Sequence, residues 1–322
     1  MSGPEHLRPC RESDAPAVIA LYERSFGIPL AESRWRWMYR SVPGSDLSHT
    51  VGCWVDGQLV GYVASVPQTW MIEGDAVAGA RIQDVCVAPH ARGRGVFTRL
   101  LHQMRQQHDA LELGMVIGFP NDRSRPIFEQ IGHYERPADV QLWRCGVVTP
   151  PRADPAGLRV EVSRRPVFRR DDVACFARNL AAYPVFQART EAYLNWRYGA
   201  ESPQDYVVLR ALDGTKQVGV AVAKHYRAGG SVDLLELITD DEPEVLGALL
   251  AEAPGAVGAP AGAALEFWAH ESYTSNARLS LAGCSWAGTT TAMIARSPVR
   301  IAHEAWRDAA SWYLSMGDSD VY

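Results

Sequence analysis

The sequence lacks every cysteine pattern that holds a metal ion or a disulfide framework. Its six cysteines are Cys10, Cys53, Cys86, Cys145, Cys175 and Cys284. No two of them are spaced as C-x-x-C, and a chain of this length does not need disulfide staples. We therefore expect six reduced thiols that fill space in strands, a cytoplasmic protein and no metal site.

Long apolar runs and basic runs are also missing. No stretch approaches the roughly 20 apolar residues that a bilayer requires. The polar start, MSGPEHLRPCRESD, has no apolar core, so no secretion signal is expected. A formal net charge of −5 gives no long-range attraction to nucleic acid. Neither a membrane nor a nucleic acid is therefore an expected partner.

What the sequence does contain is typical of a soluble globular protein. Its 322 residues, 47% apolar and 21% charged, suffice for two domains with well-filled cores. Strand and helix patterns alternate, which favours an α/β (α+β) fold. In the first half they predict a strand over 7–10, helices over 14–26 and 33–40, a hairpin over 49–77 with its turn at Asp56-Gly57, a strand over 81–87, a helix over 96–108, a strand over 113–119, a helix over 123–131 and strands over 133–148.

The same order begins again in the second half. Trp37 corresponds to Trp196 at an offset of 159 residues, and Gly61 to Gly219 at an offset of 158. Such a long repeat indicates a duplicated domain rather than a solenoid. We predict a first domain over 1–148, a proline-rich linker over 149–157, a second domain over 158–300, and a C-terminal helix with an acidic tail over 301–322.

One stretch of the first domain has the features of an anion site. The strand that ends at Val87 is followed by the turn Arg92-Gly93-Arg94-Gly95, which leads directly into a helix. Main-chain amides of a glycine-rich turn at a helix start suit a pyrophosphate. A Walker loop, G-x-x-x-x-G-K-[ST], is absent, and a dinucleotide fingerprint fails because Thr98 occupies the third glycine position.

The residues from Val87 to Gly95 read V-A-P-H-A-R-G-R-G, which resembles the V-x-P-x-x-R-G-x-G motif of the GNAT superfamily of acyl-CoA-dependent N-acyltransferases. The departure is Phe97, where that family usually has glycine or alanine. The resemblance implies two tandem GNAT-like domains, each with a mixed, mostly antiparallel sheet flanked by helices. It also implies acetyl-CoA or another acyl-CoA as cosubstrate, with its pantetheine arm added along the edge of the strand that ends at Val87. The coenzyme-binding residues implied are Val85, Cys86, Val87, Arg92, Gly93, Arg94, Gly95, Val96, Phe97, Asn121, Ser124 and Phe128.

The second copy has lost the phosphate turn. After the strand LLELIT it reads Asp240-Asp241-Glu242-Pro243-Glu244, and these carboxylates would repel a phosphate. We expect this domain to be structural or to form a wall of the acceptor pocket.

The candidate general base is Asp84, on the strand that leads into the phosphate turn. If it faces the acceptor it can take the amine proton, and if it faces the helices it is a structural hydrogen-bond acceptor. Its neighbour Gln83 is expected on the opposite face, as a substrate contact. The family often protonates the leaving thiolate with a tyrosine, but here that position is Phe128. Tyr134 or His133 is the alternative acid, and solvent is a third source.

The acceptor is predicted less directly. Trp37 and Tyr39 lie in the short second helix, where they border an acceptor pocket or fill the core. Asp318 and Asp320 of the tail either fold back towards a cationic amine or remain solvated. Tandem domains with this ending are similar to N-acyltransferases of nucleotide-linked amino sugars. The alternatives are an amino acid or other small amine, a protein lysine, or a non-catalytic acyl-CoA-binding protein.

Overall fold

The computed structural model describes residues 5–45, 47, 49–146, 157–226, 230–240, 242–269, 279–280, 282–299, 301 and 303–319. The chain divides into two compact units. The first consists of residues 1–70, 75–138 and 292–307, and the second of residues 71–74, 139–291 and 308–322. All but one residue of the predicted linker lies outside the described residues.

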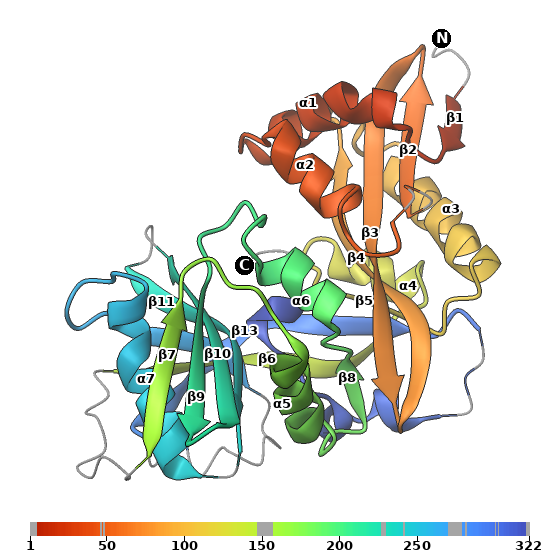
Figure 1. Cartoon of the computed structure of the whole chain (residues 1–322). Helices are drawn as coiled ribbons and strands as arrows, with labels where there is room; N and C mark the ends of the chain where they lie inside the picture. The colour runs from red at the N-terminus through yellow and green to blue at the C-terminus, as the bar shows by residue number, and fades with distance from the viewer. Residues whose placement is uncertain are drawn as a thin grey trace. The chain divides into compact units, whose positions relative to one another are not determined.

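The first unit follows the order expected from its sequence (Figure 1). Its elements are β1 (Glu5–Arg8), η1 (Glu12–Asp14), α1 (Ala15–Phe26), α2 (Glu32–Tyr39), β2 (Thr50–Val55), β3 (Gln58–Ile72), β4 (Asp75–Val87), η2 (Pro89–Ala91), α3 (Val96–Ala110), β5 (Met115–Gly118), α4 (Arg125–Gln130) and the start of β6 (Glu135–Cys145). Its strands lie in the order β1-β2-β3-β4-β5-β13, where β13 spans Cys284–Arg296. Of the pairings that fix this order, β4–β5 is parallel, whereas β1–β2, β2–β3 and β5–β13 are antiparallel.

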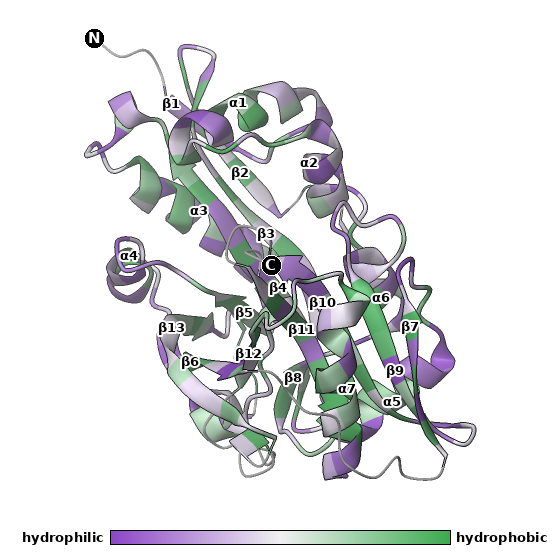
Figure 2. Ribbon diagram, turned by 90° about the vertical axis from the view of Figure 1, so that its left-hand side faces the viewer, coloured by the Kyte–Doolittle hydropathy of each residue, from purple (hydrophilic) through white to green (hydrophobic). Residues whose placement is uncertain are grey.

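Helices cover both faces of this sheet. Neighbouring residues of a strand point to opposite faces. At Gly61 of β3, an added Cβ would lie 2.6 Å from the side chain of Val96 in α3, whereas the ring of Tyr62 packs edge-on against Tyr39 of α2, with centroids 6.2 Å apart. The helices α2 and α3 therefore lie on opposite faces. Figure 2 shows that α3 contains both hydrophobic and hydrophilic residues.

The second unit has a similar order of elements, with an additional short strand, β8, between its first two helices. Its elements are β7 (Leu158–Ser163), α5 (Arg170–Leu180), β8 (Val185–Gln187), α6 (Glu191–Tyr198), β9 (Val207–Asp213), β10 (Lys216–Tyr226), β11 (Ser231–Thr239), α7 (Pro243–Ala256) and β12 (Leu265–Ala269). The sheet order is β7-β9-β10-β11-β12-β6. Among the described residues, β11–β12 is a parallel pair, whereas β7–β9, β9–β10, β10–β11 and β12–β6 are antiparallel. An added Cβ at Gly219 would lie 2.9 Å from the side chain of Val245 in α7. Gly219 thus lies under α7 as Gly61 lies under α3.

The sixth strand of each sheet comes from the other half of the sequence. In the first unit, Ile294–Arg296 of β13 pair with β5. In the second, residues 141–145 of β6 pair with β12. The predicted boundaries assign β6 to the first half and β13 to the second, because a linear sequence does not show which edge a late strand joins. The domain boundaries themselves stay a prediction.

Two expectations need correction within the second unit. Cys145 of β6 and Cys284 of β13 form a disulfide, although they lie 139 residues apart in the sequence. Free thiols were expected at both positions. The sequence does not reveal the pairing, because the two Cα atoms come within 4.0 Å of each other only when the strands are folded into the sheet. Among the described residues, Cys10, Cys53, Cys86 and Cys175 are free and buried.

The predicted C-terminal helix is the second correction. The described residues form three short 3-10 turns instead, η3 (Ala305–Arg307), η4 (Ala309–Ser311) and η5 (Met316–Asp318). Residues 311–319 are all buried, so their apolar side chains do not mark one face of a helix. Local capping also interrupts the segment, because Asp308 accepts a hydrogen bond from the Ala310 amide and Asp318 from the Ser315 amide.

Candidate active site

The glycine-rich turn of the first unit lies between β4 and α3 and is exposed. Gly93 and Gly95 have φ angles of 72° and 73°, in the left-handed region that favours glycine. Gly95 is the N-cap of α3. The first N–H groups of a helix have no hydrogen-bond acceptor within the helix. The first N–H groups of α3 therefore lie at this exposed turn, at the positive end of the helix dipole.

Two arginines hold the turn in place. Arg92 donates from Nε to the carbonyl of Val87 at 3.2 Å, which ties the turn to the end of β4. Arg99 of α3 donates to the carbonyl of Arg94 at 3.0 Å and forms an ion pair with Glu5. Arg99 is not among the residues predicted for the site, because it lies one helical turn inside α3 and belongs to no motif. The turn is therefore braced on both sides while its residues 92–95 stay exposed.

An acyl-CoA diphosphate fits this turn. At Gly93 an added Cβ would meet nothing within 4 Å, so the turn leaves open space on the side where a side chain would stand. The positive φ angles and the N-terminal end of α3 supply amides and a favourable dipole.

Beside the turn, β4 continues past the end of its parallel neighbour. The pairing of β4 with β5 runs to Ile82 and Gly118, where β5 ends. Residues 83–87 of β4 go on beyond that point. Val85 and Val87 are half-buried and Cys86 is buried, where burial raises the pKa of its thiol. This arrangement leaves a strand edge at which an extended group can add.

The candidate base has a backbone conformation that is rare for its residue type. Asp84 has a φ of 51°, and left-handed conformations in residues other than glycine are concentrated at functional sites. Its half-buried carboxylate accepts a hydrogen bond from the hydroxyl of Tyr39 in α2. It therefore faces α2, on the side of the sheet opposite α3.

The expectation that Gln83 faces away from Asp84 is wrong. Gln83 donates from Nε2 to the Tyr39 hydroxyl at 3.1 Å, so both neighbours reach the same phenol. The positive φ of Asp84 interrupts the two-residue alternation of the strand, which the sequence does not reveal. Arg81 donates to Gln83 Oε1 at 2.7 Å and extends the network. Burial, followed by the charge of Asp84, raises the pKa of Tyr39 well above 10, so its proton stays on the phenol.

The aromatic residues of the predicted site are divided between core and surface. Tyr39 is 2% exposed and belongs to the hydrogen-bond network, whereas Trp37 is half-buried. Phe97 packs edge-on against Phe128, and Phe128 against Tyr134, with centroids 5.5 Å apart in each pair. Phe97 thus replaces the family's small residue with a ring that packs on Phe128.

The candidate acids His133 and Tyr134 follow α4, and the predicted coenzyme contact Asn121 follows β5. Tyr134 is 3% exposed, and burial raises its pKa, so it stays protonated. His133 is exposed. Asn121 uses its Oδ1 to accept hydrogen bonds from the amides of Arg123 and Ser124, which fixes the start of α4. Contact of Asn121, Ser124 or Phe128 with the coenzyme stays a prediction.

The predicted tail residues lie in the second unit. Asp318 is fully buried, with Oδ1 2.9 Å from Nη1 of Arg189, which is also paired with the buried Glu236 at 2.9 Å. Contact of Asp318 with an amine would require this segment to move. Asp320 lies outside the described residues.

The start of α7 in the second unit has no glycine turn. Asp240 accepts hydrogen bonds from Arg178, Lys216 and Asn179. Burial opposes ionisation of Asp240, but these donors outweigh it and lower the pKa of the carboxyl. Asp241 lies outside the described residues.

Neither a metal cluster nor a membrane helix is found in the described part of the chain. Its His, Cys, Asp and Glu side chains form no group of three that could hold a metal ion. None of its helices is both long and apolar enough to cross a bilayer.

Residues 6–136 match the family described as acetyltransferase (GNAT) domain. No curated protein matches the sequence.

Solved structures share the fold at low identity. A probable N-acyltransferase from Enterococcus faecalis is 16% identical, with a TM-score of 0.70 over 92% of this chain and 73% of that one. A GCN5-related N-acetyltransferase from Anabaena variabilis is 12% identical, with a TM-score of 0.71 over the same shares. Eis1 from Mycobacterium abscessus is 15% identical, with a TM-score of 0.61 over 91% and 74%.

Proposed function

We propose that this chain, in which residues 6–136 form an acetyltransferase domain of the GNAT type, transfers an acyl group from acyl-CoA to the amine of a small molecule. The observation that carries the proposal is the braced turn with Gly93 and Gly95 at positive φ, open at the start of α3. Its amides would hold the coenzyme diphosphate, and the edge of β4 at residues 85–87 would hold the pantetheine arm. The coenzyme supplies the thioester, and the chain positions it.

Within this proposal, Asp84 accepts the proton of the attacking amine, directly or through one water. A neutral amine is needed for attack, and an alkyl ammonium with a pKa near 10.4 must first lose a proton. Tyr39 is a positioning residue, because its hydroxyl donates to Asp84 and receives a hydrogen bond from Gln83. The buried network Arg81–Gln83–Tyr39 would thus fix the Asp84 carboxylate beside the strand edge at residues 85–87.

Solvent is the proposed source of the proton for the leaving thiolate. A thiol with a pKa near 8.5 leaves readily as thiolate. Phe128 has no hydroxyl, and the hydroxyl of Tyr134 is buried behind an aromatic contact. We expect Tyr134→Phe and His133→Ala each to keep turnover within about twofold of the wild type. A loss of about a hundredfold in either variant would make that residue the acid.

The proposed acceptor is a nucleotide-linked amino sugar, on the basis of the sequence resemblance alone. The test measures thiol release from acetyl-CoA across nucleotide-linked amino sugars, free amino sugars, amino acids, polyamines and lysine peptides. Turnover with the first group supports the proposal. Turnover with peptides alone would make the chain a protein acetyltransferase, and binding of acetyl-CoA without any turnover would make it a non-catalytic sensor.

Variants separate the coenzyme site from the base. Gly95→Glu should abolish acetyl-CoA binding, because it adds a negative charge and a side chain to the N-cap of α3, and thermal unfolding checks that the fold is kept. Asp84→Asn should lower turnover at least about a hundredfold with acetyl-CoA affinity unchanged. Its matched control is Asp56→Asn, at a hairpin turn with a φ of 50°. Unchanged turnover in Asp84→Asn would refute the base assignment.

A further inference from the structure

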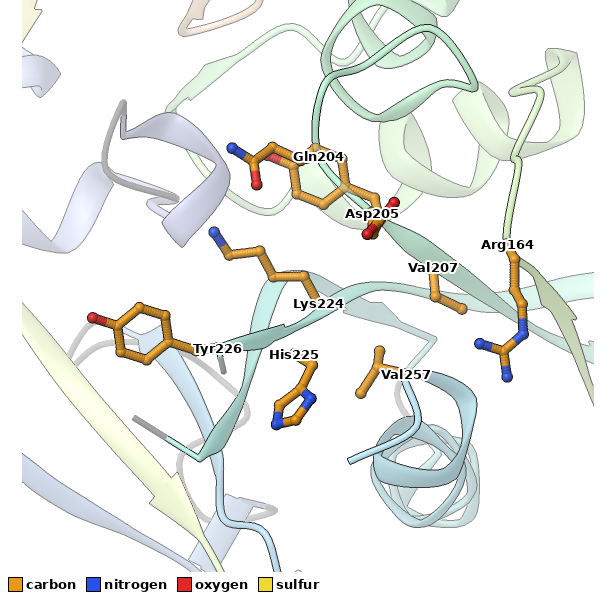
Figure 3. Close-up of a pocket in the computed structure, with 9 residues that line it drawn as sticks. Arg164, Gln204, Asp205, Val207, Lys224, His225, Tyr226 and Val257 are labelled. Atoms are coloured by element: carbon orange, nitrogen blue, oxygen red, sulfur yellow. The ribbon is translucent and has the colours of Figure 1, made fainter. Parts of the chain in front are cut away.

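The second unit contains a polar pocket that the proposed transferase function does not use. The pocket has a volume of about 540 Å³ and is formed by the end of β10, the segment before β9, and single residues that follow β7 and α7 (Figure 3). All of its lining residues belong to the second unit. A volume of this size falls within the range of small-molecule sites.

The pocket lies at the opposite end of the sheet from the lost phosphate turn. The chain leaves β11 for α7 beside Val218, where the Asp240 amide donates to the Val218 carbonyl at 2.7 Å. The pocket instead involves Lys224 and Tyr226 at the other end of β10. Lys224 lies six positions along the strand from Val218, which is about 20 Å. The pocket is therefore not a remnant of a coenzyme diphosphate site.

Cationic side chains outnumber carboxylates in the lining. Arg164 and Lys224 each contribute a positive charge, and Asp205 is the carboxylate among the lining residues. Asp233 lies opposite Lys224 on β11 and offsets part of its charge, but it is 1% exposed, so a ligand in the pocket does not meet its carboxylate directly. This balance favours a ligand that carries an anionic group.

The two ends of the pocket differ in chemistry. Tyr226 is 48% exposed and offers a ring face at one end, with the Gln204 amide nearby. Arg164 lies at the other end, and Lys224 lies between them (Figure 3). Arg164 follows β7, which is two strands away from β10 in the sheet. By the strand register, Arg164 is level with Val207 and Ala223, and Tyr226 lies three residues further along β10. Two strand spacings across and three residues along give about 14 Å between the Cα atoms of Arg164 and Tyr226, which a mononucleotide and the two side chains can span.

We propose that this pocket binds a nucleoside monophosphate, or another compound with a flat heteroaromatic ring at one end and a phosphate at the other. The ring stacks on Tyr226 and presents its polar edge to Gln204. The phosphate pairs with the guanidinium of Arg164. Lys224 reaches the ribose or phosphate oxygens between them.

Calorimetry with uridine 5′-monophosphate and adenosine 5′-monophosphate tests the proposal. We expect both to bind, and we expect uridine and ribose 5-phosphate, which each lack one end, to bind at least about tenfold more weakly. Arg164→Gln should weaken nucleotide binding about tenfold and leave uridine binding unchanged. Tyr226→Ala should weaken uridine and both nucleotides. Both residues are exposed or at the surface, so neither change threatens the core.

The matched control is Arg165→Gln, an exposed neighbour of Arg164 that is not among the lining residues. It should leave nucleotide binding unchanged. No heat with either nucleotide up to about 10 mM, or equal losses in Arg164→Gln and Arg165→Gln, would overturn the proposal. The Gly95→Glu protein should still bind uridine 5′-monophosphate, so failure of the coenzyme site and failure of this pocket give different results.

Discussion

Acid should destabilise the first unit through one buried histidine. His108 of α3 is fully buried, and its Nε2 lies 2.9 Å from the hydroxyl of Ser65. Its Nδ1 has no hydrogen-bond partner among the described residues. Burial above all, with smaller effects from the nearby His49 and Arg296, lowers the pKa of His108 to about 3. The imidazole of His108 is therefore neutral in the folded protein at pH values well above 3.

The direction and size of the effect follow from linkage. In the unfolded chain the pKa of His108 is near 6.5, so below that pH the unfolded state binds a proton that the folded state does not bind. The contribution of neutral His108 to the free energy of unfolding is fully present above about pH 6.5 and is lost as the pH falls towards 3. At pH 5 the solution is about 1.5 pH units below the pKa of His108 in the unfolded chain, and this lowers the free energy of unfolding by about 2 kcal/mol.

Urea titrations of the wild type and of His108→Gln at pH 7 and pH 5 measure this difference. Glutamine keeps a group that can bond to Ser65 but does not titrate. The wild type should lose about 2 kcal/mol more than His108→Gln between the two pH values. His102→Gln, exposed on the same helix, should behave as the wild type. Equal acid losses in His108→Gln and the wild type would refute the reasoning.

Three other changes test the network, the buried ion pairs and the disulfide. Tyr39→Phe should lower kcat/KM about tenfold and move the acid limb of the pH–rate profile to higher pH; an unmoved limb would make Tyr39 merely structural. Arg189→Gln leaves two carboxylates buried and should cost about 3–5 kcal/mol, whereas Arg178→Gln, at a 41% exposed side chain, should cost less than about 1 kcal/mol. Equal losses of unfolding free energy in Arg189→Gln and Arg178→Gln, measured by denaturant titration, would contradict the argument from burial. Reduction of Cys145–Cys284 should lower the stability of the second unit by roughly 2–5 kcal/mol, and six titratable thiols in unreduced, unfolded protein would show that the bridge is absent.

The parts of the fold that depend on local patterns could be predicted from the sequence. In the first unit the order of helices and strands, the hairpin turn at Asp56-Gly57 and the start of α3 at Val96 agree with the expectation, although β4 begins at Asp75, six residues before the expected strand over 81–87. Each depends on turn residues or on helical spacing within one segment. The α/β fold class follows from their alternation, and the GNAT-like architecture from the phosphate-turn motif that the family comparison supports.

What could not be predicted depends on contacts between distant segments. Gln83 and Asp84 alternate in a regular strand, and only the backbone shows that the positive φ of Asp84 turns both towards Tyr39. The Cys145–Cys284 bridge requires knowing which strands are neighbours. The tail around Asp318 has helical spacing, but a segment buried on all sides does not need a single apolar face.

The two units show which glycines serve the fold and which serve the coenzyme. Gly61 and Gly219 occupy equivalent strand positions, and at each an added Cβ would collide with the helix packed above it. Packing therefore requires both. Gly93 has open space around it and is needed only for its left-handed backbone. In the second unit this turn is absent and Asp240, held by Arg178, stands before the helix instead. A glycine under the packed helix is thus present in both units, whereas, among the described residues, the left-handed glycine of the turn is present only in the unit with the proposed diphosphate site. This pattern is expected if the turn serves coenzyme binding and not the stability of the fold.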